Sequence, residues 1–167
     1  EGGGGSVAGP SKEKKGYGGD PVFARSRFKS VAQTLKEVPV VSAALGPVAG
    51  LPASRFVGSH FRIMVKDNAL ILVAGPAVVS RAFGKDFTKE ELGGSDVHKK
   101  NGVTDNIAES EEDAFNQIKK FLSFFPANIY ELPPHKESKD AIDRSEKLLE
   151  EIIPKDRKKT YEMREII

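Results

Sequence analysis

The side chains that most often perform acid–base or metal chemistry are widely separated in this sequence. The three histidines, His60, His98 and His135, show no H-x-x-H or H-E-x-x-H spacing, so the pattern does not indicate a metal site. No serine lies in a G-x-S-x-G context and the chain contains no cysteine. This argues against an esterase-type serine and excludes a cysteine nucleophile. Main-chain groups are therefore the remaining candidates for chemistry.

One stretch can supply main-chain hydrogen-bond donors. Residues 45–52, LGPVAGLP, have the pattern of a buried strand, a glycine turn and the start of a helix. N–H groups at such a start are unpaired and lie in the positive field of the helix end, so they can stabilise a developing oxyanion in a dry cleft. Because Pro52 has no N–H, the candidate donors are Ala49, Gly50 and Leu51. The alternative, an ordinary helix start capped by water or a neighbour, is favoured by this short motif alone.

Hydrophobic spacing predicts the elements that position this junction. A helix is expected to open at Asp20-Pro21 and to end before Pro39. Short apolar runs predict strands over residues 39–45, 61–65 and 70–73. Further helices are expected after Pro52, after Gly75-Pro76, from the Thr88/Glu91 capping box to Gly93-Gly94, and over 110–125, with a last strand within 103–108. This alternation predicts an α/β fold with a substantially parallel sheet.

The two ends of the chain and one internal segment indicate its organisation. The 167 residues begin at Glu1 rather than Met and end at Ile166-Ile167 in an apolar segment, so we expect a fragment of a longer protein. The opening EGGGGS has the composition of a flexible linker, or of a natural glycine-rich turn. Proline and charged residues over 128–140 predict an interdomain linker, followed by a helical stretch around residues 141–149.

The overall composition excludes some classes of partner. There are 26 Lys+Arg and 24 Asp+Glu, a net charge of +2, so we expect no nucleic-acid partner. No apolar run is long enough to span a bilayer, and no basic-then-apolar opening is visible. We therefore expect no membrane association.

Several motifs in a fixed order resemble the carboxyltransferase (beta) subunits of biotin-dependent acyl-CoA carboxylases, of the propionyl-CoA and methylcrotonyl-CoA types. The most specific is IMVKDNALILVAGPAVVSRAFGKDFTKEELGGSDVH at 63–98. The others are EGGGGS at 1–6, GDPVFARSRFKS at 19–30, LGPVAG at 45–50, NGVTD at 101–105, FLSFFPAN at 121–128, PP at 133–134 and YEMREII at 161–167. Together they span nearly the whole chain.

The resemblance implies a crotonase-like (ClpP/crotonase) spiral of ββα units, present here as a partial domain. Residues 1–127 would be the C-terminal half of the first, acyl-CoA-side carboxyltransferase domain. Residues 128–140 would be the linker, and residues 141–167 the start of the second domain. Such subunits form homo-oligomers, commonly hexamers, whose active site lies between the first domain of one subunit and the second domain of its partner.

The implied reaction moves a carboxyl group from carboxybiotin to the α-carbon of a short or branched acyl-CoA, through an enolate held by backbone amides. The implied partner is a biotin carboxylase or biotin carrier subunit, and no metal is implied in this segment. A decarboxylase such as glutaconyl-CoA decarboxylase would run the same half-reaction backwards. A non-catalytic acyl-CoA-binding scaffold is a further alternative, and a crotonase-type hydratase or isomerase is a weaker one because no catalytic glutamate pair can be placed.

The resemblance also implies roles for individual residues. Ala49-Gly50-Leu51 stand where the family has the Ala-Gly-Gly that carries the oxyanion amides. Substrate-binding positions would be Gly46, Pro47, Gly75, Pro76, Gly93, Gly94 and, in a supporting role, His98. Departures from the family are Leu51 for glycine, Ser54 and Phe56 for tyrosine and proline, and His60 at an aspartate position. Arg55 is expected in a core-facing or interface ion pair.

Overall fold

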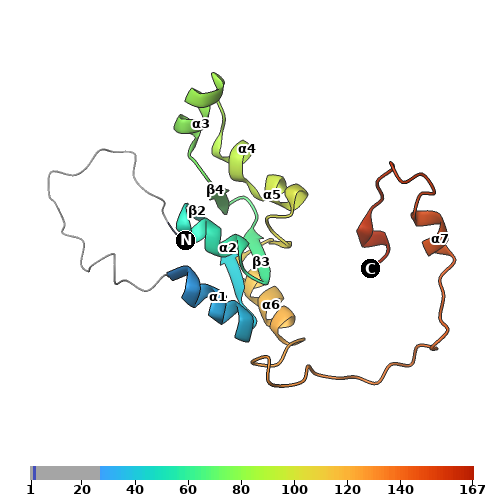
Figure 1. Cartoon of the computed structure of the whole chain (residues 1–167). Helices are drawn as coiled ribbons and strands as arrows, with labels where there is room; N and C mark the ends of the chain where they lie inside the picture. Colours follow the sequence, from blue (N-terminus) through green and yellow to red (C-terminus); the bar gives the residue numbers. More distant parts are fainter. Residues whose placement is uncertain (1, 3–26) are drawn as a thin grey trace. The chain divides into compact units, whose positions relative to one another are not determined.

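The computed structural model describes residue 2 and residues 27–167 (Figure 1). The chain divides between Pro134 and His135 into two compact units. The expected helix start at Asp20-Pro21 and most of the glycine-rich opening lie outside the described residues.

Three parallel strands in the order β1-β3-β5 form the main sheet of the first unit. They are β1 (Val41–Ala44), β3 (Phe61–Val65) and β5 (Asn106–Ala108). Strands that run in the same direction need a crossover connection, which is usually a helix. The prediction of a parallel sheet from alternating strands and helices is confirmed.

A second, two-stranded sheet is also parallel and pairs β2 (Pro47–Ala49) with β4 (Leu70–Leu72). The strand β4 was predicted, whereas the sequence pattern predicted only a turn at β2. Gly2 extends this sheet by an isolated parallel bridge to Val48. A Cβ atom at Gly2 would lie 2.5 Å from the side chain of Pro52, so this position has room only for glycine.

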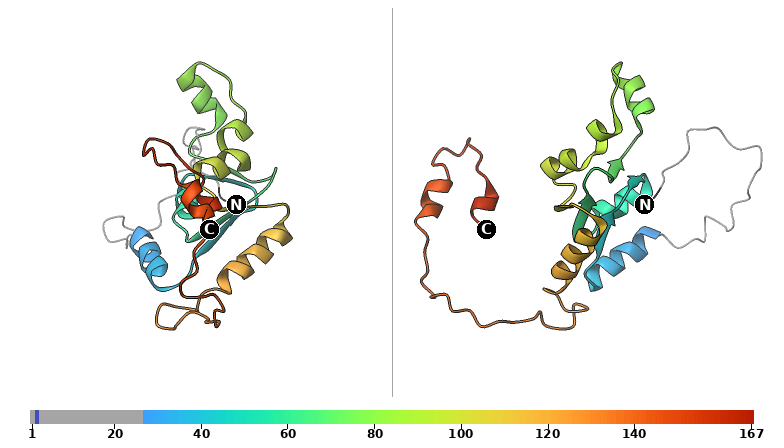
Figure 2. Two further views of the ribbon diagram at one scale, coloured as in Figure 1. Left: turned by 90° about the vertical axis from the view of Figure 1, so that its right-hand side faces the viewer. Right: turned by 180° about the vertical axis from the view of Figure 1, so that it is seen from behind.

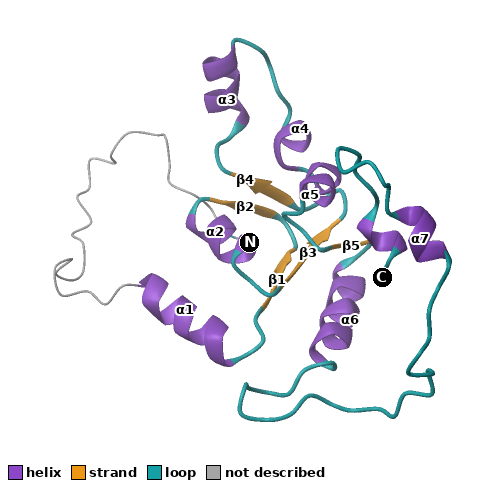
Figure 3. Ribbon diagram, turned by 45° about the vertical axis from the view of Figure 1, so that its right-hand side comes forward, coloured by secondary structure: helices purple, strands orange, loops and turns teal. Residues whose placement is uncertain are grey.

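Six helices of the first unit accompany these strands in the described residues. They are α1 (Arg27–Glu37), α2 (Leu51–Val57), α3 (Pro76–Phe83), α4 (Lys89–Gly93), α5 (Ser95–Asn101) and α6 (Glu111–Leu122). Helix α2 packs against β1 and β2, and α6 packs against β3 and β5 (Figure 3). Helix α3 extends away from the strands and buries none of its residues (Figures 1 and 2).

Local signals place the starts of two of these helices. At α4 the Thr88 hydroxyl accepts from the Glu91 N–H at 3.1 Å, and the Glu91 carboxylate accepts from the Thr88 N–H at 2.8 Å. This confirms the predicted capping box. At α6 the Ser110 hydroxyl accepts from the Asp113 N–H at 3.1 Å. Helix α6 ends at Leu122, three residues before the predicted end at 125.

The apolar core of the first unit has two parts. One lies around α2 between the two sheets and includes Ala44, Val48, Phe56, Met64 and Ile71. The other lies under α6, where the ring of Phe121 stacks on Phe61 with centroids 4.5 Å apart. Because α2 belongs to the first part of the core, the junction at its start is held on a packed scaffold.

The second unit, residues 135–167, holds one short helix, α7 (Leu148–Ile152), and a 3-10 turn, η1 (Met163–Glu165). The helical stretch expected around residues 141–149 is therefore shorter than predicted. Ile142 is fully exposed, and a short segment with no buried face gains no packing energy to hold a helix. Arg144 bridges Asp140 and Glu146 within this unit.

Candidate active site

The junction between β2 and α2 turns on one glycine. Gly50 has φ 66° and ψ −132°, a conformation that residues with a Cβ rarely adopt. This turn takes the chain directly from Ala49, the last residue of β2, into Leu51, the first residue of α2, with Pro52 in the first turn. Proline is favourable there because its missing N–H would have no partner within the helix.

The donors at this junction are two rather than three. The Ala49 N–H donates to the Gly2 carbonyl at 2.8 Å, which corrects the expectation that Ala49 offers a free donor. Gly50 and Leu51 have no main-chain or side-chain acceptor for their N–H groups among the residues that the structure describes. Both residues are exposed, Leu51 to 39%. The arrangement is two consecutive N–H groups at the start of a helix that have no acceptor among the described residues, so they can donate to an oxygen atom of a ligand.

Gly46 and Pro47 take part in the scaffold of this junction. Gly46 is buried, and its carbonyl accepts from the Leu70 N–H at 3.3 Å. The Pro47 carbonyl accepts from the Gly2 N–H at 3.3 Å. Both contacts hold the strand that leads into Gly50, so these two residues help to fix the position of the donors.

Gly75 and Pro76 form the start of α3 and lie apart from this junction in the fold. The Gly75 carbonyl accepts from the Val78 and Val79 N–H groups at 3.1 and 3.2 Å. A Cβ at Gly75 would meet nothing within 4 Å. The structure leaves open space beside this turn, and a role in substrate binding stays a prediction.

Gly93, Gly94 and His98 attach α4 and α5 to β4. A Cβ at Gly93 would come 2.3 Å from the Ile71 carbonyl oxygen, and one at Gly94 would come 2.7 Å from that of Glu90. The His98 ring is 8% exposed, with Nε2 2.8 Å from the Ile71 carbonyl oxygen and Nδ1 3.3 Å from the Asn101 amide. Because the amide donates to Nδ1, Nε2 carries the proton and donates to Ile71. The structure thus gives His98 a packing role, and a supporting role at the substrate stays a prediction.

His60 has a structural role that the sequence did not reveal. Its ring Nδ1 accepts from the Val40 N–H at 3.0 Å, and its main-chain N–H donates to the Val40 carbonyl at 2.9 Å. The ring thereby satisfies a main-chain donor just before β1. A carboxylate can accept the same hydrogen bond, so histidine can replace the family's aspartate here without loss of this contact.

Arg55 faces solvent and does not form the core-facing ion pair that was one of the two expectations, whereas an interface ion pair stays a prediction. Across residue 2 and residues 27–167, the salt bridges join Arg62 to Asp105, Lys66 to Glu109, and Arg144 to Asp140 and Glu146. Arg55 is in none of them and is exposed. Its guanidinium is therefore available for a ligand, and the sequence alone gave no signal for this.

The Arg62–Asp105 pair fixes the loop before β5. Asp105 accepts from the Arg62 side chain at 2.7 and 3.0 Å and from the Arg62 main-chain N–H at 2.8 Å. The hydrogen bond to Asp105 raises the pKa of Arg62 above its ordinary value. This clamp explains why the predicted strand over 103–108 begins only at Asn106.

Two findings bear on the other expectations. Among the described residues there is no group of three or more acidic or histidine side chains that could hold a metal ion. None of the helices in that part of the chain combines the length and apolar character needed to cross a membrane.

Comparison with solved structures defines the fold class. The chain is similar to the crystal structure of transcarboxylase 12S, a hexamer assembly with hydrolyzed methylmalonyl-coenzyme A bound. The TM-score is 0.64 at 31% identity, over 83% of this chain and 27% of that chain. The beta subunit of P. aeruginosa geranyl-CoA carboxylase shares the fold at TM-score 0.51 and 24% identity, over 83% of this chain and 26% of that chain. The fold is crotonase-like and is present here as part of a domain.

The chain belongs to the carboxyl transferase domain family, whose model matches residues 16–167. It is 34% identical over 141 residues to the propionyl-CoA carboxylase carboxyltransferase subunit of Haloferax mediterranei, covering 84% of this chain and 27% of that protein. It is 33% identical to the mitochondrial propionyl-CoA carboxylase beta chain of Homo sapiens, over 78% of this chain and 24% of that protein. The chain is also similar to the methylmalonyl-CoA decarboxylase subunit alpha of Veillonella parvula, at 32% identity over 78% of this chain and 26% of that protein. The chain thus spans about a quarter of the length of these relatives.

Proposed function

We propose that the protein to which this chain belongs is a biotin-dependent acyl-CoA carboxyltransferase. The observation that carries the proposal is the pair of N–H groups at Gly50 and Leu51, which have no acceptor within the described structure. They stand at the position that matches the oxyanion motif of the family. Family membership supplies the reaction class, and the junction supplies a group that can perform the demanding step.

That step is the formation of an enolate at the α-carbon of the acyl-CoA. As the α-proton leaves, negative charge develops on the thioester oxygen. The N–H groups of Gly50 and Leu51 donate to that oxygen and lower the energy of the charged state. Donors that are fixed by the fold need no reorganisation during the reaction, and the Gly50 turn and the contacts of Gly46 and Pro47 fix them.

Carboxybiotin, carried by a partner carrier subunit, would supply the carboxyl group, and the biotin left after its decarboxylation would accept the α-proton at N1. The family resemblance implies that residues 1–127 form the acyl-CoA side of the site, so in this proposal the N–H pair binds the thioester oxygen. Residues 128–140 are the linker and residues 141–167 the start of the domain that receives biotin. Since Gly50 and Leu51 are exposed, the second domain of a partner subunit in a homo-oligomer of the hexamer type would exclude water from them.

The acyl chain is short or branched, of the propionyl-CoA or methylcrotonyl-CoA type. The Leu51 side chain stands where the resemblance implies that many relatives have none, and it would reduce the space beside the thioester. The direction of the reaction has a second candidate, decarboxylation, which the similarity to the Veillonella parvula decarboxylase subunit favours. For location we propose the cytoplasm or the mitochondrial matrix, since some relatives are mitochondrial.

The experiment that tests the proposal is carboxyl transfer by the full-length protein. Purified protein is incubated with free carboxybiotin and a panel of short and branched acyl-CoA thioesters, and carboxylated products are measured by mass spectrometry. We expect a carboxylated product from at least one thioester. A protein that binds CoA thioesters but transfers no carboxyl group in either direction would be a scaffold, and the proposal would be wrong.

A further inference from the structure

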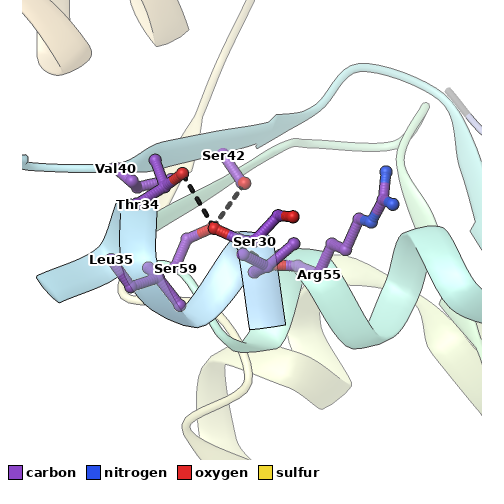
Figure 4. Close-up of a pocket in the computed structure, with 8 residues that line it drawn as sticks. Ser30, Thr34, Leu35, Val40, Ser42, Arg55 and Ser59 are labelled. Carbon is purple, nitrogen blue, oxygen red and sulfur yellow. Dashed lines mark hydrogen bonds between the residues drawn. The ribbon is translucent and has the colours of Figure 1, made fainter. Parts of the chain in front are cut away.

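Two cavities of the first unit meet at Arg55. The first has a volume of about 440 Å³ and lies between α1 and α2, with Ser30 and Thr34 on one side and Ser42, Arg55 and Ser59 on the other (Figure 4). The second, also about 440 Å³, is lined by Arg55 and Ser42 again and by Pro52. Because Pro52 directly follows Leu51, the second cavity brings Arg55 close to the proposed oxyanion donors along the helix.

Among the described residues, Arg55 is the only charged one that lines either cavity, and their linings include no described aspartate or glutamate. In the part of the chain that the structure describes, no carboxylate lies within salt-bridge distance of Arg55. A guanidinium presents a planar fork of N–H donors that matches a carboxylate in two parallel hydrogen bonds. The Arg55 side chain can therefore bind an anion at these cavities.

A chain of hydrogen bonds holds the main chain at Arg55. The Ser59 hydroxyl donates to the Arg55 carbonyl at 3.0 Å, and the Ser42 hydroxyl lies 2.6 Å from that of Ser59. Since the Ser59 proton is already donated, Ser42 is the donor of the second bond. These hydroxyl protons are thus committed to the protein. Figure 4 shows the guanidinium extending away from the Ser42–Ser59 pair.

The position of Arg55 on α2 relates it to the thioester. Arg55 follows Leu51 by one helical turn, so the two residues share a face of the helix. Side chains on a helix tilt toward its N-terminus, which directs the guanidinium toward the start of α2. The phosphates of coenzyme A lie a full pantetheine arm away from the thioester, whereas a carboxylate on the acyl group lies within a few bonds of it. This separation favours a carboxylate of the acyl portion as the ligand.

We propose that Arg55 binds a carboxylate on the acyl portion of the substrate or product. This inference rests on the proposed function, because it takes the thioester to lie at Gly50 and Leu51. The carboxylate can come from two sources: the transferred carboxyl group on the α-carbon, or the terminal carboxylate of a dicarboxylic acyl chain. In either case Arg55 orients the acyl group, and it discriminates carboxylated from uncarboxylated thioesters.

The test compares Arg55→Ala and Arg55→Lys with the wild-type full-length protein, and with Arg81→Ala as a control at an exposed arginine of α3. Steady-state KM and kcat are measured with propionyl-CoA in the forward direction, methylmalonyl-CoA in the reverse direction, and glutaryl-CoA in the forward direction. For Arg55→Ala we expect KM to rise about 10- to 100-fold only for thioesters that carry the recognised carboxylate. Arg55→Lys should restore part of the loss, since it keeps the charge without the fork. Arg81→Ala should change nothing.

The pattern of the loss identifies the source. A loss confined to methylmalonyl-CoA indicates the transferred carboxyl group, and a loss with glutaryl-CoA in the forward direction indicates a terminal carboxylate. Two results with an active wild type would show that the inference is wrong while the proposed function stands. In the first, Arg55→Ala keeps KM and kcat for all three thioesters. In the second, it loses as much activity with propionyl-CoA as with methylmalonyl-CoA and glutaryl-CoA. If the wild type transfers no carboxyl group, the proposed function fails and the inference fails with it.

Discussion

The Ala49 N–H donates to the Gly2 carbonyl at 2.8 Å, across a bridge that joins the beginning of the chain to the strand before the proposed oxyanion site. This contact has two effects on the site. It uses one of the three N–H groups of the Ala49-Gly50-Leu51 motif, which leaves those of Gly50 and Leu51 as the donors without an acceptor in the described residues. It also fixes the strand from which Gly50 turns.

A substitution at Gly2 tests the structural value of this bridge. In Gly2→Val the new side chain would overlap Pro52, since even a Cβ would lie 2.5 Å from it. We expect the bridge to be lost and the full-length protein to lose about 1–3 kcal/mol of stability, measured by chemical denaturation. Gly75→Ala, where a Cβ meets nothing within 4 Å, is the control and should be near neutral. Equal stabilities of the two variants would contradict the bridge.

The packing role of His98 predicts a loss of stability without a loss of substrate affinity. His98→Ala removes the donor to the buried Ile71 carbonyl and leaves a cavity at the α5–β4 contact, at a cost of about 1–3 kcal/mol. The KM for acyl-CoA of the folded variant should equal that of the wild type. A raised KM with unchanged stability would instead indicate that His98 contacts the substrate.

The capping box of α4 predicts a dependence of stability on pH. The hydrogen bond from the main-chain N–H of Thr88, and after it a hydrogen bond with the Thr88 side chain, lower the pKa of Glu91. A lowered folded-state pKa means that the stabilisation is present above the unfolded-state pKa, about 4.3, and is lost as the pH falls through the folded-state value. The difference in Tm between the wild type and Glu91→Gln should be constant near neutral pH and should shrink below about pH 4.

Glu90→Gln provides the matched control for that measurement. Glu90 lies in the same first turn, but its side chain makes no hydrogen bond within the described structure. The difference in Tm between Glu90→Gln and the wild type should change less over the same acidic range. A difference for Glu91→Gln that stays constant from pH 7 to pH 2.5 would show that the carboxylate charge does not contribute through the cap.

Sequence patterns predicted the parts of the fold that depend on local signals. The capping box at Thr88, the serine cap at Ser110 and the apolar run 61–65 each specify an element by their own chemistry, and each is found. The alternation of such elements was sufficient to predict the parallel sheet. The family resemblance then correctly indicated the crotonase-like fold.

Features that depend on distant contacts were not predictable. Strand β2 has three residues and exists because β4 and Gly2 pair with it. Helix α5 has no marked apolar stripe and is held by the His98–Ile71 hydrogen bond. The same limit applies to the site. A motif can show that Ala49 lacks a helical partner, but only the fold shows that Gly2 supplies one. The free guanidinium of Arg55 is likewise visible only when all neighbouring carboxylates have been placed.

The most direct test of the central claim is to remove one main-chain donor and keep its neighbours. Leu51→Pro deletes the Leu51 N–H at a helix position that tolerates proline, and Leu51→Gly shortens the same side chain but keeps the N–H. We expect kcat/KM of the full-length enzyme for acyl-CoA carboxylation to fall about 10²–10³-fold in Leu51→Pro and to stay within about threefold in Leu51→Gly. Equal activities in two folded variants would show that the Leu51 N–H does not hold the thioester oxygen.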